Sequence, residues 1–198
     1  GPAAREDVQA WRAESDVILT GRGTVEADDC ALTLRRCENR LSDDDWQRAL
    51  ARPTPRAVVD SFAVVAPNAK VVGGETSTYL FTRSDAAPYV AMPPTVSHIE
   101  VADKQGGVDL KAVLKALGDK GANEILIEAG PTLVGALEQE GLIDQWLIYM
   151  APSMLGADAR PVHSGVFKKL SDAPRYSVTS HNLIGGDLRI TLRAADDN

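Results

Sequence analysis

The sequence has 198 residues, of which 44% are hydrophobic and 25% charged, a balance typical of a globular protein that buries a core without disulfides or metals. Its 28 acidic and 21 basic residues give a net charge of −7, which argues against a nucleic-acid-binding protein. Local cations can still hold an anionic small molecule on such a surface. We find no apolar run of membrane-spanning length and no signal-peptide pattern, so we expect a cytoplasmic protein with no membrane partner.

The two cysteines, Cys30 and Cys37, do not form a CxxC pair, and the three histidines are scattered. The sequence therefore indicates neither a disulfide framework nor a metal site, and we expect two free thiols. The length fits one domain over residues 1–198. A helical pattern begins at once with no leading strand, which suggests a domain cut from a longer protein.

Hydrophobic periodicity and turn residues divide the chain into alternating helices and strands. Helices are predicted at residues 3–15, 25–29 and 110–117 and from 131 onward, and strands at 16–20, 57–60, 78–82, 97–101, 124–128, 146–150, 176–181 and 188–192. Residues 31–35 are expected to be extended, and the polar residues 38–55 to be mostly surface loop. The alternation predicts a three-layer α/β fold, with a mixed, mostly parallel sheet, helices on both faces, and a C-terminal antiparallel hairpin at one edge.

Two small-residue turns follow predicted strands, at the end of the sheet where α/β folds bind ligands. The first, residues 21–24, lacks the third glycine of a dinucleotide fingerprint; it either receives a phosphate or only connects strand to helix tightly. The second runs from Glu128 through Gly130 into a helix that Pro131 opens. Its glycines either admit a ligand or only allow the helix to pack closely, and both interpretations stay open.

The chemistry that these turns favour needs no protein nucleophile. No serine lies in a nucleophile elbow. Hydride transfer requires only a nicotinamide and a substrate carbon held face to face, and is compatible with phosphate-type turns. Arg12, Arg22 and Arg35 are the nearest cations in sequence; they suit bidentate phosphate binding unless they are ordinary solvated arginines.

Two blocks carry a resemblance to a known family. One reads TVEADD over residues 24–29 and continues with Leu32, Thr33 and Arg35, and the other reads EAGPTL over residues 128–133. Shorter matches follow in the same order at residues 4–9, 15–21, 56–61, 149–152 and 155–160. Together they resemble the reductase domain of the bacterial bifunctional riboflavin biosynthesis deaminase/reductase.

The resemblance implies a dihydrofolate-reductase-like fold, NADPH as cofactor, a homo-oligomer, and reduction of 5-amino-6-(5-phosphoribosylamino)uracil, a phosphorylated pyrimidine, to its ribitylamino product. The implied NADPH contacts are Thr24, Asp28, Ser61, Gly130, Pro131, Thr132, Leu133, Val134, Gly135 and Ala136. The implied substrate contacts are Arg12, Leu32, Arg35 and Glu128, with the arginines suited to the phosphate. We expect hydride to reach C1′ of the ring-opened ribosyl imine, with Asp28 or Glu128 as the acid that assists proton movement.

The sequence departs from the family pattern in three ways. Cys30 stands where a proline is usual, the zinc-binding deaminase signature is absent, and the family's strand before the first helix would lie upstream of Gly1. No clear clamp for the NADPH 2′-phosphate is visible, although Arg22 or Arg83 would suit one. The upstream strand contributes to the family's site, so its absence bears on turnover by this chain.

Two other functions stay open. One is a stand-alone reductase for another pyrimidine or pterin substrate; if that substrate has no phosphate, replacing Arg12 or Arg35 by alanine should matter little. The other is a non-catalytic dimerisation or ligand-binding domain, which would tolerate replacement of Asp28 and Glu128. In either case, residues 146–150 and 155–156 are candidates for a subunit contact.

Overall fold

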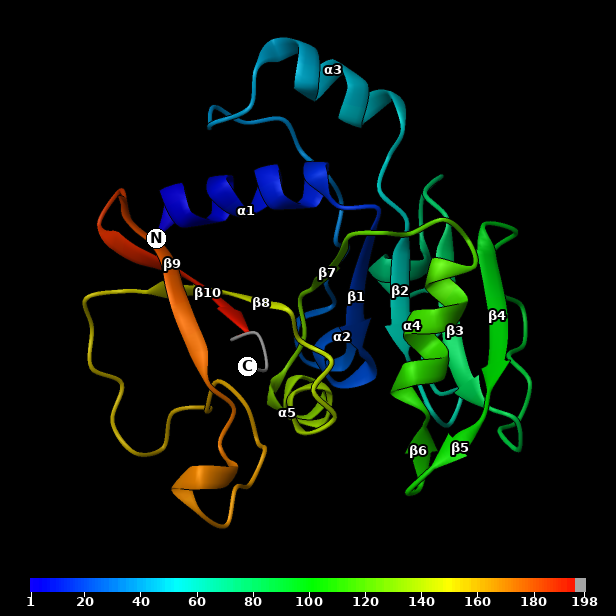
Figure 1. Ribbon diagram of the computed structural model, residues 1–198. Coiled ribbons are helices and arrows are strands. Elements are labelled where there is room, and N and C mark those ends of the chain that lie inside the picture. The colour runs from blue at the N-terminus through cyan, green and yellow to red at the C-terminus, as the bar shows by residue number, and fades with distance from the viewer. Residues whose placement is uncertain (195–198) are drawn as a thin grey trace. The chain divides into compact units, whose positions relative to one another are not determined.

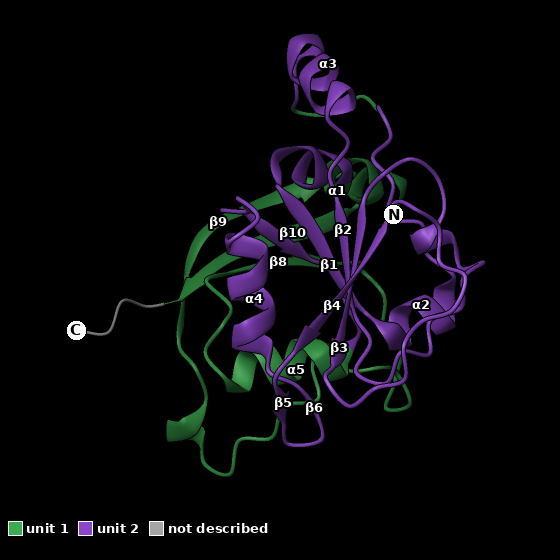
Figure 2. Ribbon diagram, turned by 90° about the vertical axis from the view of Figure 1, so that its right-hand side faces the viewer, with its two compact units in different colours: residues 1–8, 37–40, 131–198 green, residues 9–36, 41–130 purple. Residues whose placement is uncertain are grey.

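The computed structural model describes residues 1–194, which divide into two compact units (Figure 2). We call residues 9–36 and 41–130 the parallel unit, and residues 1–8, 37–40 and 131 onward the antiparallel unit, after their sheets. Helix α1 (Pro2–Glu14) begins in the antiparallel unit and ends in the parallel unit. Each unit is described by itself.

The parallel unit is built on five parallel strands in the order β4-β3-β2-β1-β7 (Figure 1). These strands are β1 (Val17–Gly21), β2 (Arg56–Val59), β3 (Thr78–Arg83), β4 (Val96–Val101) and β7 (Ile125–Ile127). From β1 the chain moves outward to β4, and it later returns to pair β7 with the other side of β1. The border between β1 and β7 is therefore the topological switch point, where α/β sheets bind their ligands.

Helices cover both faces of this sheet. Helix α2 (Arg22–Asp28) and helix α4 (Leu110–Gly118) lie on opposite faces (Figure 2). On one face Ile18, Val58 and Leu80 pack in a cluster with Val25 of α2, because side chains of a strand alternate between its two faces. A short hairpin, β5 (Asp103–Lys104) and β6 (Gly107–Val108), and a 3₁₀ turn, Lys70–Val72, complete the unit and were not predicted.

The prediction of a loop over residues 38–55 is wrong, because helix α3 (Asp43–Ala51) occupies its centre. Ser42 and Asp45 form a capping box, in which each side chain accepts a hydrogen bond from the other residue's backbone, and this satisfies N–H groups at the start of the helix. Trp46 is buried and anchors α3. The acidic first turn, which suggested a loop, is also what a helix N-terminus favours.

The antiparallel unit contains helix α5 (Pro131–Gln139) and a three-stranded antiparallel sheet in the order β8-β10-β9. Its strands are β8 (Gln145–Met150), β9 (Tyr176–Ile184) and β10 (Asp187–Ala194), with a 3₁₀ turn at Leu170–Asp172. The α/β class and the C-terminal hairpin are confirmed. One detail differs: the hairpin pairs with β8 in a sheet of its own and does not extend the parallel sheet.

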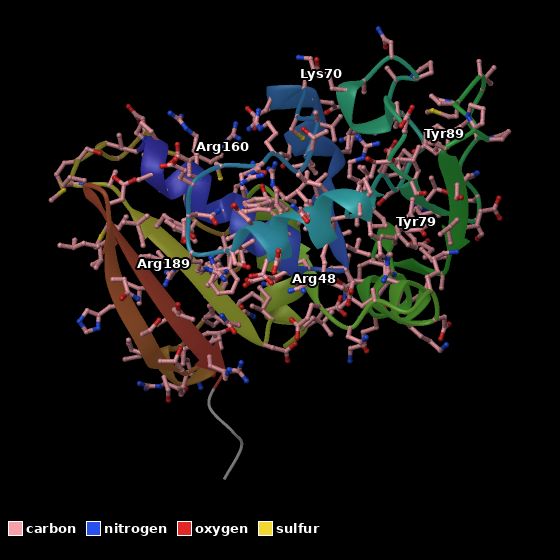
Figure 3. All side chains as sticks on the ribbon, turned by 90° about the horizontal axis from the view of Figure 1, so that it is seen from above. Arg48, Lys70, Tyr79, Tyr89, Arg160 and Arg189 are labelled. Carbon is pink, nitrogen blue, oxygen red and sulfur yellow. The ribbon has the colours of Figure 1, made fainter. Side chains whose placement is uncertain are left out.

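A buried carboxylate ties the first turns of α1 to this sheet. Asp7 accepts hydrogen bonds from Tyr149 Oη on β8 at 2.5 Å and from Arg189 Nη1 on β10 at 2.7 Å. Figure 3 labels Arg189 on this sheet. Charge-assisted bonds of this kind hold a helix more firmly than neutral ones. Within residues 1–194, no helix has the length and apolar character needed to cross a membrane.

The start of the parallel sheet yields a stability prediction. The Asp16 carboxylate accepts hydrogen bonds from the backbone N–H groups of Asn123 (2.9 Å) and Glu124 (3.1 Å), which join β1 to β7 and lower the pKa of Asp16. We predict that Asp16→Ala lowers the free energy of unfolding by about 1 kcal/mol at neutral pH. Because a lowered folded-state pKa contributes stability only above the unfolded value, this difference should shrink as pH falls below about 4.

Urea unfolding of the wild type and Asp16→Ala across this pH range measures the effect. A difference that stays constant down to about pH 3 would contradict the role given to the Asp16 carboxylate.

Candidate active site

The two predicted phosphate turns meet at the switch point. Thr24 follows β1, Gly130 follows β7, and the Gly130 backbone N–H donates to Thr24 Oγ1 at 3.0 Å. Because parallel strands end at the same edge, neighbouring strands bring these residues together. The first turn is not a loop: Gly21 is the N-cap, and α2 begins at Arg22, three residues before the predicted start.

A bidentate ion pair lies at the same edge. Arg12, in the last turn of α1, donates from Nε to Glu128 Oε1 at 2.6 Å and from Nη2 to Glu128 Oε2 at 2.7 Å. The Arg12 side chain is 12% exposed and that of Glu128 is 23% exposed, so water screens this pair less than a surface pair. Two predicted substrate residues therefore orient each other, and Glu128 is not simply solvated.

The predicted extended segment at residues 31–35 carries the other two substrate residues. Leu32 is buried in the hydrophobic cluster of the sheet and has a left-handed backbone (φ 49°). Arg35 is exposed, and its backbone N–H donates to Gln9 Oε1 at 2.8 Å. Among residues 1–194 its guanidinium makes no ion pair, so it is available to an external anion in a way that Arg12 is not.

Asp28 is the last residue of α2, and Cys30 follows two residues later. Asp28 is exposed, and the following Asp29 caps α2 with a left-handed backbone. Burial, and then the nearby carboxylates of Asp28 and Glu128, raise the pKa of the Cys30 thiol.

Ser61 follows β2, the neighbour of β1 on the side opposite β7. The preceding residue, Asp60, is fully buried, and its Oδ2 accepts from the backbone N–H groups of Val64 and Val65, both at 2.7 Å, and from Tyr89 Oη at 2.6 Å. Burial and the hydrogen bond to Asp60 raise the pKa of Tyr89. Asp60 therefore fixes the loop that begins with Ser61.

The predicted cofactor segment 130–136 passes from the parallel to the antiparallel unit after Gly130. Within the antiparallel unit, Ser164 donates from its backbone N–H (3.0 Å) and from Oγ (3.1 Å) to the carbonyl oxygen of Pro131. A Cβ atom added to Gly135 would lie 2.6 Å from the backbone nitrogen of Gly165. Gly135 thus allows residues 164–165 to pack closely on α5.

The two arginines considered for a 2′-phosphate already have carboxylate neighbours. Arg22 lies 3.7 Å from Glu26 in the next turn of α2. Arg83 is hydrogen-bonded to Asp85, which raises the pKa of Arg83, and lies 3.6 Å from Asp103. Both guanidinium groups therefore have an acidic neighbour, although the exposed Arg22–Glu26 pair is a weak interaction. Within residues 1–194, no group of three or more His, Cys, Asp and Glu side chains is arranged to hold a metal ion.

Sequence reasoning missed two residues that shape this region, Gln9 and Asp60. Gln9 shares a face of α1 with Arg12, three residues on, and this spacing was a usable signal. Asp60 ends an apolar strand immediately before a predicted cofactor residue, and a buried carboxylate there needs several donors.

The chain is similar to known proteins over nearly its whole length. The model of the RibD C-terminal domain family matches residues 1–190. The riboflavin biosynthesis protein RibD of Escherichia coli (strain K12) is 38% identical over 197 residues, covering 98% of this chain and 53% of that protein. The 5-amino-6-(5-phosphoribosylamino)uracil reductase of Buchnera aphidicola (subsp. Acyrthosiphon pisum) is 31% identical over 192 residues, covering 96% of this chain and 91% of that protein.

The structure of Acinetobacter baumannii RibD (form 2) superposes with a TM-score of 0.81 at 30% identity, over 98% of this chain and 51% of that one. A five-stranded parallel sheet with a C-terminal antiparallel sheet is thus the fold of RibD reductase structures. The chain belongs to the RibD C-terminal domain family, which confirms the resemblance found in the sequence. It spans about half the length of the two RibD proteins.

The packing of α5 leads to a prediction about two helical glycines. We expect Gly135→Ala to lower the free energy of unfolding by about 2 kcal/mol, because the new methyl group would displace the backbone at residues 164–165. Gly23→Ala is the matched control: nothing lies within 4 Å of its Cβ position in α2, and alanine is the better helix former by about 1 kcal/mol. Urea unfolding followed by tryptophan fluorescence distinguishes the two. Equal effects of the two substitutions would contradict the packing role of Gly135.

Proposed function

We propose that this chain, over residues 1–198 and as one reductase domain, catalyses the NADPH-dependent reduction of 5-amino-6-(5-phosphoribosylamino)uracil to 5-amino-6-(5-phosphoribitylamino)uracil in riboflavin biosynthesis. The observation that carries the proposal is the Arg12–Glu128 pair at the switch point, together with the exposed guanidinium of Arg35, which makes no ion pair within residues 1–194. Membership of the RibD C-terminal domain family supports it, as does the similarity to a Buchnera reductase of nearly the same extent.

The edge of the parallel sheet has features that fit a nicotinamide dinucleotide. Gly23 has open space at its Cβ position, and at Gly130 a Cβ would meet only Thr24 Oγ1, at 3.5 Å. Bare backbone of this kind allows a ligand to approach closely. We propose that Thr24, Asp28, Ser61 and Gly130 of the parallel unit hold NADPH, which supplies the hydride when bound. The NADPH contacts implied for residues 131–136 of the antiparallel unit stay a prediction. NADPH in preference to NADH stays a prediction, since Arg22 and Arg83 are engaged by carboxylates.

The remaining residues have distinct proposed tasks. Arg35 binds the substrate phosphate, because its guanidinium is exposed and makes no ion pair in the described part of the chain. Glu128 is oriented by Arg12 through both oxygens, so its remaining lone pairs can accept hydrogen bonds from substrate hydroxyl groups. Asp28 is exposed at the end of α2 and is our candidate for the group that moves a proton to the reduced imine.

Oxidation of NADPH, followed at its near-ultraviolet absorbance with freshly deaminated substrate, tests the proposal. We expect Arg35→Ala to raise KM for the phosphorylated substrate by about tenfold or more, because a charge-assisted phosphate contact is lost. Arg36→Ala is the matched control, since this exposed neighbour pairs with Asp43 at 2.6 Å; it should change KM less than about twofold.

The same assay distinguishes the proposed reaction from the two other functions that the sequence leaves open. A dephosphorylated substrate reduced as efficiently as the phosphorylated one, with no effect of Arg35→Ala, would favour a reductase for another pyrimidine. Absence of both turnover and NADPH binding, in this chain and in a version extended upstream, would favour a non-catalytic binding domain.

We further propose that the chain forms a homo-oligomer through its antiparallel unit. Strands β8 and β9 are the two edges of the three-stranded sheet, and β9 exposes Val178 and Leu183, the latter at 76%. Residues 154–170 add exposed Met154, Leu155 and Leu170. Exposed apolar side chains beside an open strand edge are typical of a subunit contact. The cytoplasmic location expected from the sequence stays a prediction.

Sedimentation velocity measures the oligomeric state. We expect a dimer or larger species for the wild type and a shift to monomer for Leu183→Lys, because a charge opposes burial of this edge. A wild-type monomer at micromolar concentration would contradict the proposal.

A further inference from the structure

The segment Ala31–Arg35 has no regular secondary structure, yet side chains hold its backbone at every second residue. Arg56 Nη1 donates to the carbonyl oxygen of Ala31 at 3.2 Å, and Arg12 Nη1 donates to that of Thr33 at 2.9 Å. The backbone N–H of Arg35 donates to Gln9 Oε1 at 2.8 Å. These side chains thus form the backbone hydrogen bonds that a neighbouring strand would form in a sheet.

The backbone is strained just before this segment and within it. Asp29 and Leu32 both have left-handed conformations, with φ of 42° and 49°. For residues other than glycine each such conformation costs on the order of 1 kcal/mol, and it persists only where the surroundings determine it. Strain of this kind, in a segment that carries candidate substrate residues, points to positioning.

Arg56 anchors the start of the segment from inside the fold. It opens β2, is 1% exposed, and also donates from Nη2 to the carbonyl oxygens of Gly73 (2.9 Å) and Thr76 (2.7 Å). Burial lowers the pKa of Arg56. A guanidinium can serve several carbonyl groups at once because its donors are fixed in a fork. The first residue of the segment is thereby tied to the core.

Gln9 acts at the other end of the segment, where Arg35 stands. It is 5% exposed, and its amide oxygen accepts a hydrogen bond from the backbone N–H of Arg35. The resemblance to the family assigns no role to Gln9. The position of the backbone determines where the long side chain of Arg35 can reach. Because the hydrogen bond to Gln9 already fixes this backbone, less entropy is lost when the guanidinium binds an anion.

We propose that Gln9 is a positioning residue for the substrate site: it holds the backbone of Arg35, in concert with Arg12 and Arg56, so that the guanidinium is presented to the substrate phosphate. The proposal rests on the proposed function for the identity of that anion. It does not require Gln9 to touch the substrate.

Steady-state kinetics of Gln9→Met tests the role of the amide, because methionine keeps the length of the side chain and loses the acceptor. We expect KM for the phosphorylated substrate to rise about fivefold, while kcat and KM for NADPH stay within about twofold. In an Arg35→Ala background, Gln9→Met should produce no further rise, since Gln9 acts through Arg35.

Asp16→Ala is the matched control, because it removes a side-chain acceptor of backbone N–H groups at the opposite end of the sheet. It should leave KM unchanged. An equal rise in KM for Asp16→Ala, or a full further rise for Gln9→Met in the Arg35→Ala background, would overturn the proposal.

Hydrogen exchange of the Arg35 amide gives a readout that does not depend on turnover. In Gln9→Met this amide should exchange at least about tenfold faster than in the wild type, while the amide of Asn123 stays unchanged. Unchanged exchange at Arg35 would overturn the positioning role. Faster exchange without any NADPH oxidation by the wild type would support the positioning of Arg35 and contradict the proposed reaction instead.

Discussion

The bidentate ion pair between Arg12 and Glu128 is the contact on which the candidate site depends. It joins the end of α1 to the residue that follows β7, and both side chains are largely withdrawn from water. Loss of either partner would leave a poorly solvated charge behind, which costs more than the pair itself contributes. Arg12 also donates a hydrogen bond to the carbonyl oxygen of Thr33. One guanidinium therefore positions both the Glu128 carboxylate and the backbone of residues 31–35.

The topology of the parallel sheet explains why this pair lies where a ligand can reach it. Strand β1 is flanked by β2 and β7, which are far apart in sequence. Residues that follow these strands therefore gather at one edge, with Thr24 bonded to Gly130 across the switch point. The glycines of the two turns have different tasks: Gly23 leaves open space, whereas Gly135 makes room for the backbone of residues 164–165.

Much of this could be predicted from the sequence, because periodicity reports which strands and helices are buried. The parallel strands, the hairpin around Gly185 and the helix after Pro131 all follow from such patterns. The helix α3 could not be recognised by acidity alone, since its stability depends on a capping box and on burial of Trp46. The separate sheet of β8, β9 and β10 was missed because pairing partners are set by tertiary packing.

The residues of the site could be predicted from the sequence, but the hydrogen bonds and ion pairs between them could not. The EAGPTL block pointed to Glu128, but only the structure shows that Arg12 occupies both of its oxygens. A buried guanidinium that binds carbonyl groups, as Arg56 does, has no periodic signature. The bond from the Arg35 backbone N–H to Gln9 could not be predicted either, although the spacing of Gln9 and Arg12 places both residues on one face of α1.

A double-mutant cycle of Arg12→Met and Glu128→Gln on kcat/KM for NADPH oxidation tests the central claim most directly. If the two side chains act as one unit, the double variant should lose little more activity than either single variant, with a coupling energy of about 1.5 kcal/mol or more. Losses that add to within about 0.5 kcal/mol would contradict the account, because independent residues would then carry the site.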